Sequence, residues 1–174
     1  ARRARAEDCL LPIHRAAERG DTVKLAKLLA EDKYQADAED KCDTKVRPLM
    51  LAAFGGHTRC VELLLNEGGV NRDIADKEGG TALLVAVGRE HATVVKLLLD
   101  DIGLDPNLIP DTTKNGCKTA LMDASWEGKT SMVELLLAHE RVDPYMVNSR
   151  GNTALMFAAA KGHAPVVALL LPNE

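Results

Sequence analysis

The hydrophobic and polar residues of this chain follow one pattern that recurs five times. Each copy holds a short motif, two small residues just after it, and a later apolar run rich in leucine. The motifs are Leu11-Pro12-Ile13-His14, Arg47-Pro48-Leu49-Met50, Thr81-Ala82-Leu83-Leu84, Thr119-Ala120-Leu121-Met122 and Thr153-Ala154-Leu155-Met156. Their second residues, here called the reference residues, are 12, 48, 82, 120 and 154, spaced 36, 34, 38 and 34 apart. Such a period predicts an array of stacked units.

The third copy shows which elements the pattern predicts. Residues 76–80 contain two glycines and form a turn, and Thr81 is suited to cap the helix that follows. Leu83 and Ala86 give this first short helix one apolar face, and His91 opens a second, more apolar helix. One such pair cannot bury its own apolar surface, but stacked neighbours can.

The copies resemble the ankyrin repeat, most closely in Gly151-Asn152-Thr153-Ala154-Leu155-Met156 and in the Val-Val-x-Leu-Leu-Leu run that ends at Leu171. The resemblance covers about residues 8–171. It implies an all-α fold, an ankyrin-type helix-turn-helix solenoid of about five stacked repeats with turn or hairpin tips. The predicted domains are an N-terminal extension over 1–7 and a single array over 8–174, with repeats at about 8–41, 42–75, 76–113, 114–147 and 148–171.

Bulk composition narrows the class of function. The formal net charge of −4 argues against a general nucleic-acid binder, which is normally basic. Four scattered cysteines without a C-x-x-C motif fit a reducing compartment, so we expect a cytoplasmic or nuclear protein that is not secreted. No run of about 18 apolar residues occurs, so no membrane span is expected.

The histidines are the main candidates for chemistry. His57, His91 and His163 occupy equivalent positions at the start of second helices. Because these positions fall on separate layers, we expect each imidazole to bond the local backbone at the start of its own helix rather than a metal. Sequence motifs of nucleotide-binding loops, α/β-hydrolases and zinc proteases are missing from the chain. The prediction is a non-enzymatic protein with no catalytic residue, cofactor or metal.

Two aromatic residues mark a candidate binding surface. Phe54 and Trp126 both lie six positions after a reference residue, a column that the ankyrin resemblance places on the concave face. We predict that both rings anchor a partner. The alternative is that Trp126 lies flat over its neighbours and contributes only to packing. Charged candidates share this surface: Arg89, Lys114, Lys118, Glu127, Arg150 and Lys161. Their mainly basic character favours an acidic partner segment, unless the charges are simply a solvated mixture.

Three functions from different classes remain open at this stage. The first is a protein-interaction module that holds a partner segment on its concave face. The second is binding of a small anionic ligand such as a nucleotide, and the third is a structural spacer within a larger scaffold. Two structural expectations accompany them. Met50, Met122 and Met156 should face the core of the stack, and the almost wholly apolar segment 164–171 should contact a further domain or a second copy.

Overall fold

A computed structural model describes residues 10–31, 36–41, 44–67, 70–110 and 118–171. These residues form ten helices and no strand, which confirms the all-α prediction. The first helices of the five repeats are α2 (Pro12–Arg19), α4 (Pro48–Phe54), α6 (Ala82–Gly88), α8 (Ala120–Glu127) and α10 (Ala154–Lys161). The second helices are α3 (Thr22–Leu29), α5 (Thr58–Asn66), α7 (Ala92–Asp100), α9 (Thr130–Leu137) and α11 (Ala164–Leu170).

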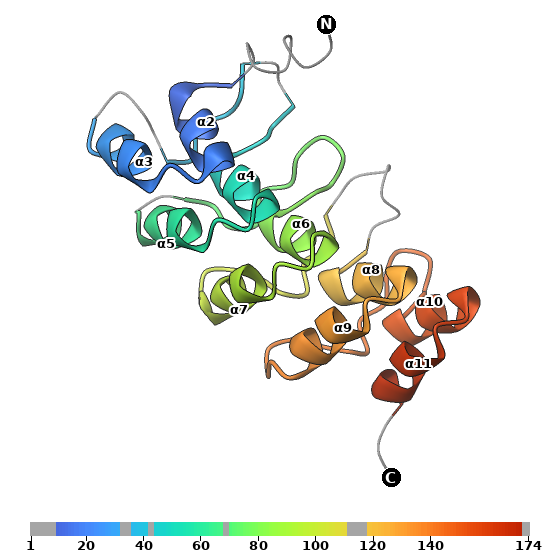
Figure 1. Ribbon diagram of the computed structural model, residues 1–174. Helices are drawn as coiled ribbons and strands as arrows, with labels where there is room; N and C mark the ends of the chain where they lie inside the picture. The colour runs from blue at the N-terminus through green and yellow to red at the C-terminus, as the bar shows by residue number, and fades with distance from the viewer. Residues whose placement is uncertain (1–9, 32–35, 42–43, 68–69, 111–117, 172–174) are drawn as a thin grey trace, which may run out of the picture.

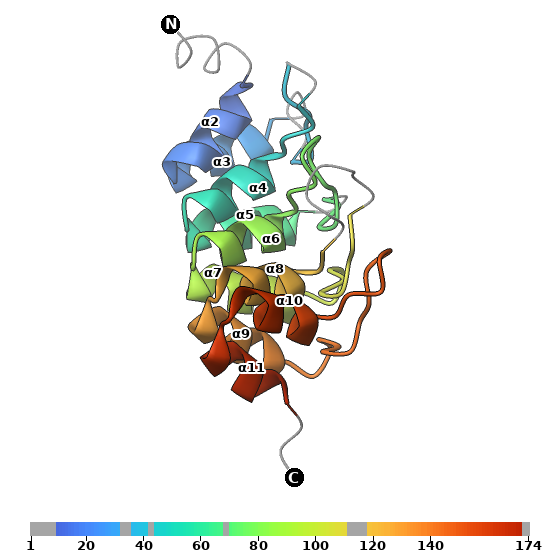
Figure 2. The same ribbon diagram turned by 90° about the vertical axis from the view of Figure 1, so that its right-hand side faces the viewer.

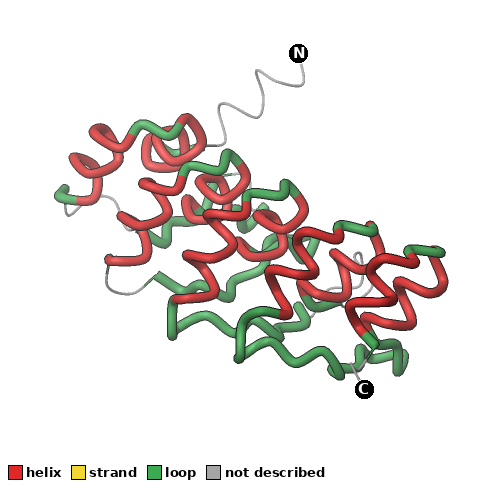
Figure 3. The backbone as a smooth tube through the Cα atoms, turned by 60° about the horizontal axis from the view of Figure 1, so that its bottom comes forward, coloured by secondary structure: helices red, strands yellow, loops and turns green. Residues whose placement is uncertain are grey.

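The helices stack in two parallel rows. Figure 1 shows the first helices in one row and the second helices beside them, each packed on the equivalent helix of the next repeat. We call these the first-helix row and the second-helix row. The loops that join one repeat to the next lie together on one side of the helices (Figures 2 and 3). Each loop leads into the start of a first helix, so the ends of the first helices lie away from the loops.

The helix starts follow the capping chemistry read from the sequence. The hydroxyls of Thr81, Thr119 and Thr153 accept hydrogen bonds from the backbone N–H three residues later, at 3.2, 3.2 and 3.3 Å. Pro12 and Pro48 instead occupy the first turn of their helices, where a missing N–H costs nothing. All five first helices therefore begin where the recurring motif predicts.

Small side chains bring the two rows together. Ala52 and Ala53 of α4 are fully buried, and so are the leucines of the second helices that pack on the neighbouring layers, Leu64, Leu98 and Leu136. Two of the three core methionines behave as expected, since Met50 and Met122 are 5% and 1% exposed. The expectation was wrong for Met156, which is 53% exposed because no further layer follows α10 and α11 among the described residues.

Successive repeats are linked by a recurring hydrogen bond, which we call the repeat joint. The joint residue lies nine positions after the reference residue, just before a second helix. The Nε2 atoms of His57, His91 and His163 lie 2.9, 3.0 and 3.0 Å from backbone oxygens of the preceding repeat. Because a carbonyl oxygen can only accept, Nε2 is the donor. The histidines do bond backbone, but in the neighbouring repeat rather than locally.

A glycine makes room for each histidine of a joint. Gly20, Gly56 and Gly128 have φ values of +70, +69 and +71°. A Cβ built on any of them would come within 2.6 to 3.0 Å of the imidazole of the next repeat. Glycine is therefore required at this position for two reasons: the backbone is left-handed, and the imidazole ring lies against it.

The joint between repeats 3 and 4 uses different residues for the same bond. Lys129 replaces the histidine, and its Nζ donates to the Gly88 carbonyl at 2.5 Å. Glu90 replaces the glycine and keeps the left-handed backbone, with a φ of 60°. A lysine side chain brings no ring against this position, so a Cβ is tolerated there. The two exceptions in the sequence thus belong to one joint.

Arg141 provides an additional link between repeats 3 and 4. Its guanidinium donates to the carbonyls of Leu104 and Asp101 at 2.9 and 2.8 Å, and also to that of Leu99. These carbonyls lie at the end of α7 and just after it, where backbone acceptors lack helical partners. One side chain of repeat 4 therefore holds the end of a helix in repeat 3.

Candidate functional site

Phe54 and Arg89 form a stacked pair on the first-helix row. Phe54 is the last residue of α4 and is 47% exposed. Arg89 follows α6, and its guanidinium carbon lies 3.8 Å from the centre of the Phe54 ring. A cation over an aromatic face is attracted by the negative charge of the ring surface. Phe54 and Arg89, which were predicted as separate partner contacts, therefore form one unit.

Trp126 lies at the centre of a second cluster, between repeats 4 and 5. The Lys161 Nζ lies 3.9 Å from the centre of the Trp126 ring, and the Lys118 Nζ lies 4.8 Å from it. Phe157 meets the same ring edge to face, with centroids 5.6 Å apart and an interplanar angle of 85°. Helical side chains lean toward the start of their helix, which is how Trp126 comes near Lys118. The indole is still 36% exposed.

The two clusters share one geometric rule. In each, the aromatic ring lies six positions after a reference residue, and the cation lies seven positions after the next one. Arg89 of repeat 3 covers Phe54 of repeat 2, and Lys161 of repeat 5 covers Trp126 of repeat 4. We call Phe54–Arg89 and Trp126–Lys161 the ring–cation pairs. Between them, repeat 3 has Gly88 at the ring position and repeat 4 has Glu127 at the cation position.

The other residues predicted for the partner-binding surface lie in different surroundings. Lys118 makes an ion pair with Asp123 at 3.1 Å, and Glu127 makes one with Lys129 at 2.5 Å. Arg150 is exposed in the turn before α10. Lys114 falls outside the residues that the structure describes. The structure thus brings Trp126, Lys118 and Lys161 together, pairs Phe54 with Arg89, and leaves Arg150 and Glu127 apart from both rings.

Charge is available on the ring–cation pairs themselves. Within the described ranges, neither Arg89 nor Lys161 has a carboxylate partner, whereas Lys118 and Lys129 each have one. A cation fixed over a ring has lost part of its side-chain freedom before any partner arrives. Such a group is well suited to bind a carboxylate.

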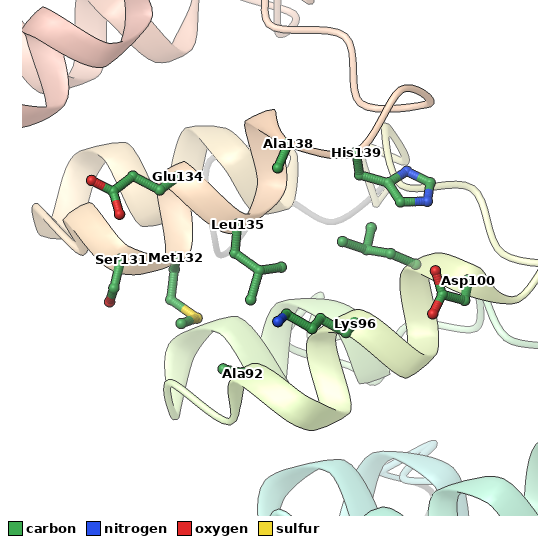
Figure 4. Close-up of a pocket in the computed structure, with 10 residues that line it drawn as sticks. Ala92, Lys96, Asp100, Ser131, Met132, Glu134, Leu135, Ala138 and His139 are labelled. Atoms are coloured by element: carbon green, nitrogen blue, oxygen red, sulfur yellow. The ribbon is translucent and has the colours of Figure 1, made fainter.

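A separate groove lies on the second-helix row, between α7 and α9 (Figure 4). Its volume is about 530 Å³, whereas the corresponding groove between α5 and α7 measures about 190 Å³. Apolar side chains form its floor, and Lys96, Asp100 and Glu134 contribute charges of both signs. The ring–cation pairs lie on the other row of helices, so this groove is not part of their surface.

The described residues offer little for catalysis or metal binding. Nowhere in these ranges do three His, Cys, Asp or Glu side chains gather closely enough to hold a metal ion. Cys60 is fully buried, and burial raises the pKa of its thiol, which disfavours the nucleophilic thiolate. No helix in the same ranges has the length and apolar character that a membrane crossing requires.

Comparison with known proteins agrees with this architecture. A family model for ankyrin repeats, built of three copies, matches residues 13–110 and 107–174. The chain belongs to the ankyrin repeat family. Ankyrin repeats are generally protein-interaction modules without enzymatic activity.

Several curated ankyrin-repeat relatives are much longer than this chain. Ankyrin repeat and KH domain-containing protein mask-1 of Caenorhabditis elegans is 33% identical over 164 residues, which is 90% of this chain and 6% of that protein. The probable E3 ubiquitin-protein ligase XBOS34 of Oryza sativa subsp. japonica is 36% identical over 57% of this chain and 19% of its own length. The human photoreceptor ankyrin repeat protein is 38% identical over 52% of this chain and 20% of its own.

Sequence reasoning missed the residues that join the ankyrin repeats. Glu90 was visible as the one exception to a recurring glycine, and Lys129 occupies the column that otherwise holds histidine in repeats 2, 3 and 5. The coincidence of the two exceptions in adjacent repeats was the available signal. For Arg141 no such signal existed, because its acceptors are backbone carbonyls about forty positions earlier in the chain.

Proposed function

We propose that this chain is a non-catalytic module that binds an acidic segment of another protein along the concave side of the first-helix row. The observation that carries the proposal is the pair of cations, Arg89 and Lys161, each held over an aromatic ring and without a carboxylate partner in the described ranges. The four scattered cysteines are consistent with such a module working in the cytoplasm or nucleus.

The two parts of each pair serve different contacts. The guanidinium of Arg89 and the ammonium of Lys161 bind carboxylates of the partner. The exposed parts of Phe54 and Trp126 take its apolar side chains. Arg150, together with Lys114, adds positive charge that attracts the acidic segment before it docks. Lys118 contributes less charge because Asp123 neutralises it.

One observation favours the second candidate, a small anionic ligand. Lys118 and Lys161 both lie within 5 Å of one indole ring, as a compact phosphate site would need. A base that stacked on Trp126 would have to move Lys161 off the ring face. The second pair, two repeats away at Phe54, has no role for a small ligand. We therefore favour the extended partner, and the spacer function is the outcome if neither ligand binds.

The test is a selection from a library of displayed peptides, followed by affinity measurement from the fluorescence anisotropy of each selected peptide, which carries a dye and is titrated with wild type or variant protein. Selected peptides are expected to be acidic and to carry an apolar residue. Replacing an anchor costs about 2 kcal/mol or more, so Trp126→Ala should weaken binding about 30-fold. Arg89→Met and Lys161→Met should each weaken it and reduce its salt dependence. Lys96→Met, on the second-helix row, is the matched control.

Three outcomes would contradict the proposal. Selection of peptides without acidic residues would show that the cations do not select an acidic partner. Equal affinity of the wild type, Arg89→Met and Lys161→Met for the selected peptides would show that this surface is not the binding site. Saturable quenching of Trp126 by a nucleotide, with no peptide selected, would favour the small anionic ligand instead.

A further inference from the structure

The C-terminal end of the array exposes positions that the other repeats bury. Met156 and Leu171 are 53% and 49% exposed, whereas Met122, which is equivalent to Met156, is 1% exposed. The end face also holds a shallow apolar groove of about 320 Å³. It is lined by Ala159, Gly162, Ala164, Val167, Ala168 and Leu171. We call this surface the end face.

The end face carries the accepting half of a repeat joint. Gly162 has a φ of +74°, as the joint glycines do, but no atom of the described chain lies within 4 Å of a Cβ built on it. At Gly128, the equivalent position one repeat earlier, the same Cβ would lie 2.6 Å from His163. The Ala160 carbonyl likewise corresponds to that of Trp126, which accepts the bond from His163 at 3.0 Å.

We propose that the end face binds a further ankyrin-type helix pair whose second helix is preceded by a histidine. That imidazole stacks on Gly162 and donates to the Ala160 carbonyl, while the apolar side chains of the pair cover Met156 and Leu171. The identity of the joint residue follows from the internal joints. Glycine lies opposite histidine in three of them, and Glu90 lies opposite lysine in the fourth.

A second copy of the chain does not supply the missing half. Its first repeat has Asp21 at the joint position, and the Asp21 carboxylate already accepts a hydrogen bond from the Lys24 N–H at 2.9 Å. An ionised carboxylate cannot donate to the Ala160 carbonyl and would be repelled by it. Two end faces brought together would present two accepting halves. The partner is therefore a different helix pair that carries a donor.

The test adds such a pair in register. A tandem protein carries residues 138–171 a second time, directly after Leu171, since Leu137 and Leu171 end equivalent apolar runs 34 residues apart. Hydrogen exchange is then measured at the amides of α11 in the original copy. The added pair should slow this exchange roughly tenfold or more, because burial and the new joint oppose local opening. The change His163→Asp, made in the added copy only, should remove most of that protection, and His163→Lys should keep part of it.

A second variant keeps the test informative if the added pair folds poorly. Gly162→Ala strains the backbone in both proteins, but only in the tandem does its Cβ meet an imidazole. Its loss of stability should therefore be larger in the tandem. Unchanged exchange in α11, or equal protection by the histidine and aspartate tandems, would overturn the proposal. Reversible self-association of the original chain that Leu171→Asp abolishes would also overturn it, in favour of a second copy.

Discussion

The joint between repeats 3 and 4 differs from the other three in every component. Joints 1/2, 2/3 and 4/5 each place an imidazole on a glycine of the preceding repeat. Joint 3/4 instead uses Lys129 and Glu90, adds the three-carbonyl link of Arg141, and follows the longest spacing between reference residues, 38. The groove of about 530 Å³ between α7 and α9 lies at this same joint.

The array therefore keeps the same bond at all four joints, while the residue that makes it varies. At each joint one N–H group donates to the equivalent carbonyl of the preceding first helix. Either an imidazole or an ammonium group can be this donor. The choice of donor decides which residue fits at the facing position of the preceding repeat. An imidazole ring requires glycine there, whereas the flexible side chain of lysine does not. At joint 3/4, where the second helices leave a wide groove, Arg141 donates to three backbone carbonyls of the preceding repeat, whereas at joint 1/2 Arg47 donates to one, that of Asp37.

The largest expected effect comes from removing the additional link. Arg141→Met leaves three carbonyls at the end of α7 without their charged donor. Hydrogen bonds to charged groups contribute about 1.5–3 kcal/mol each, and part of that returns when water replaces the donor, so we expect a loss of about 3 kcal/mol in the free energy of unfolding. Urea unfolding measures it. The control Arg150→Met, on an exposed turn, should change the free energy by less than about 0.5 kcal/mol, and a similar small change for Arg141→Met would show that the link is dispensable.

Exchanging the joint chemistry should give the next largest effect. Lys129→His places a ring against the Cβ of Glu90, which should cost about 1–2 kcal/mol. Adding Glu90→Gly should recover that cost. A double-mutant cycle by urea unfolding measures the coupling between positions 129 and 90, which should reach about 1 kcal/mol. The cycle separates this coupling from the benefit that glycine alone brings at a φ of 60°. Strict additivity of the two changes would mean that the glycine–histidine pairing has no energetic basis.

A smaller effect should separate an internal joint from the end face. Gly128→Ala and Gly162→Ala both force alanine into the left-handed region, at φ values of +71 and +74°, for about 1 kcal/mol each. Only at Gly128 does the new Cβ approach His163, to 2.6 Å. We expect Gly128→Ala to cost about 1 kcal/mol more than its partner in thermal or urea unfolding. Equal losses would show that the imidazole moves aside freely.

The smallest expected effect concerns a titratable bond across joint 1/2. His14 is fully buried, and the distance from its Nε2 to the Val46 carbonyl is 3.1 Å. Burial lowers the pKa of His14 below its ordinary value of 6.5, although the bond to Val46 and the charge of Asp40 act in the opposite direction. The unfolded chain therefore takes up a proton that the folded chain resists, so this contribution is full above pH 6.5 and is lost as the pH falls below it.

Urea unfolding of the wild type and of His14→Gln at several pH values measures this contribution. Glutamine keeps an N–H donor for Val46 but does not titrate, so the variant should lose less stability than the wild type as the pH falls through 6.5. Parallel pH profiles would place the acid sensitivity of the array elsewhere.

Much of the fold was predictable because it depends on residues close together in the chain. The threonine caps act over three residues, and the apolar faces of helices recur over one or two turns. The failure at Met156 has the same cause, since its motif is identical in kind to that of Met122. A motif cannot report whether another layer follows it.

The candidate surface was predictable in its residues but not in their arrangement. Phe54 and Trp126 were identified as exposed rings, and their exposure is confirmed. Their contacts with Arg89 and Lys161 were missed, because each cation lies 35 residues after its ring and comes from the next repeat. Which side chains meet depends on how far one layer is shifted against the next, and that shift is set by packing over the whole joint.

The sequence by itself determined the repeat, its helix starts, its buried small residues and its membership of the ankyrin repeat family. These are matters of local hydrogen bonding and of which face of a helix is apolar. Only the tertiary structure decided which carbonyl each joint residue reaches, which ring each cation covers, and that Gly162 and Met156 lie open at the end face. Those outcomes depend on the registration of one layer on another, which arises only when the layers are packed together.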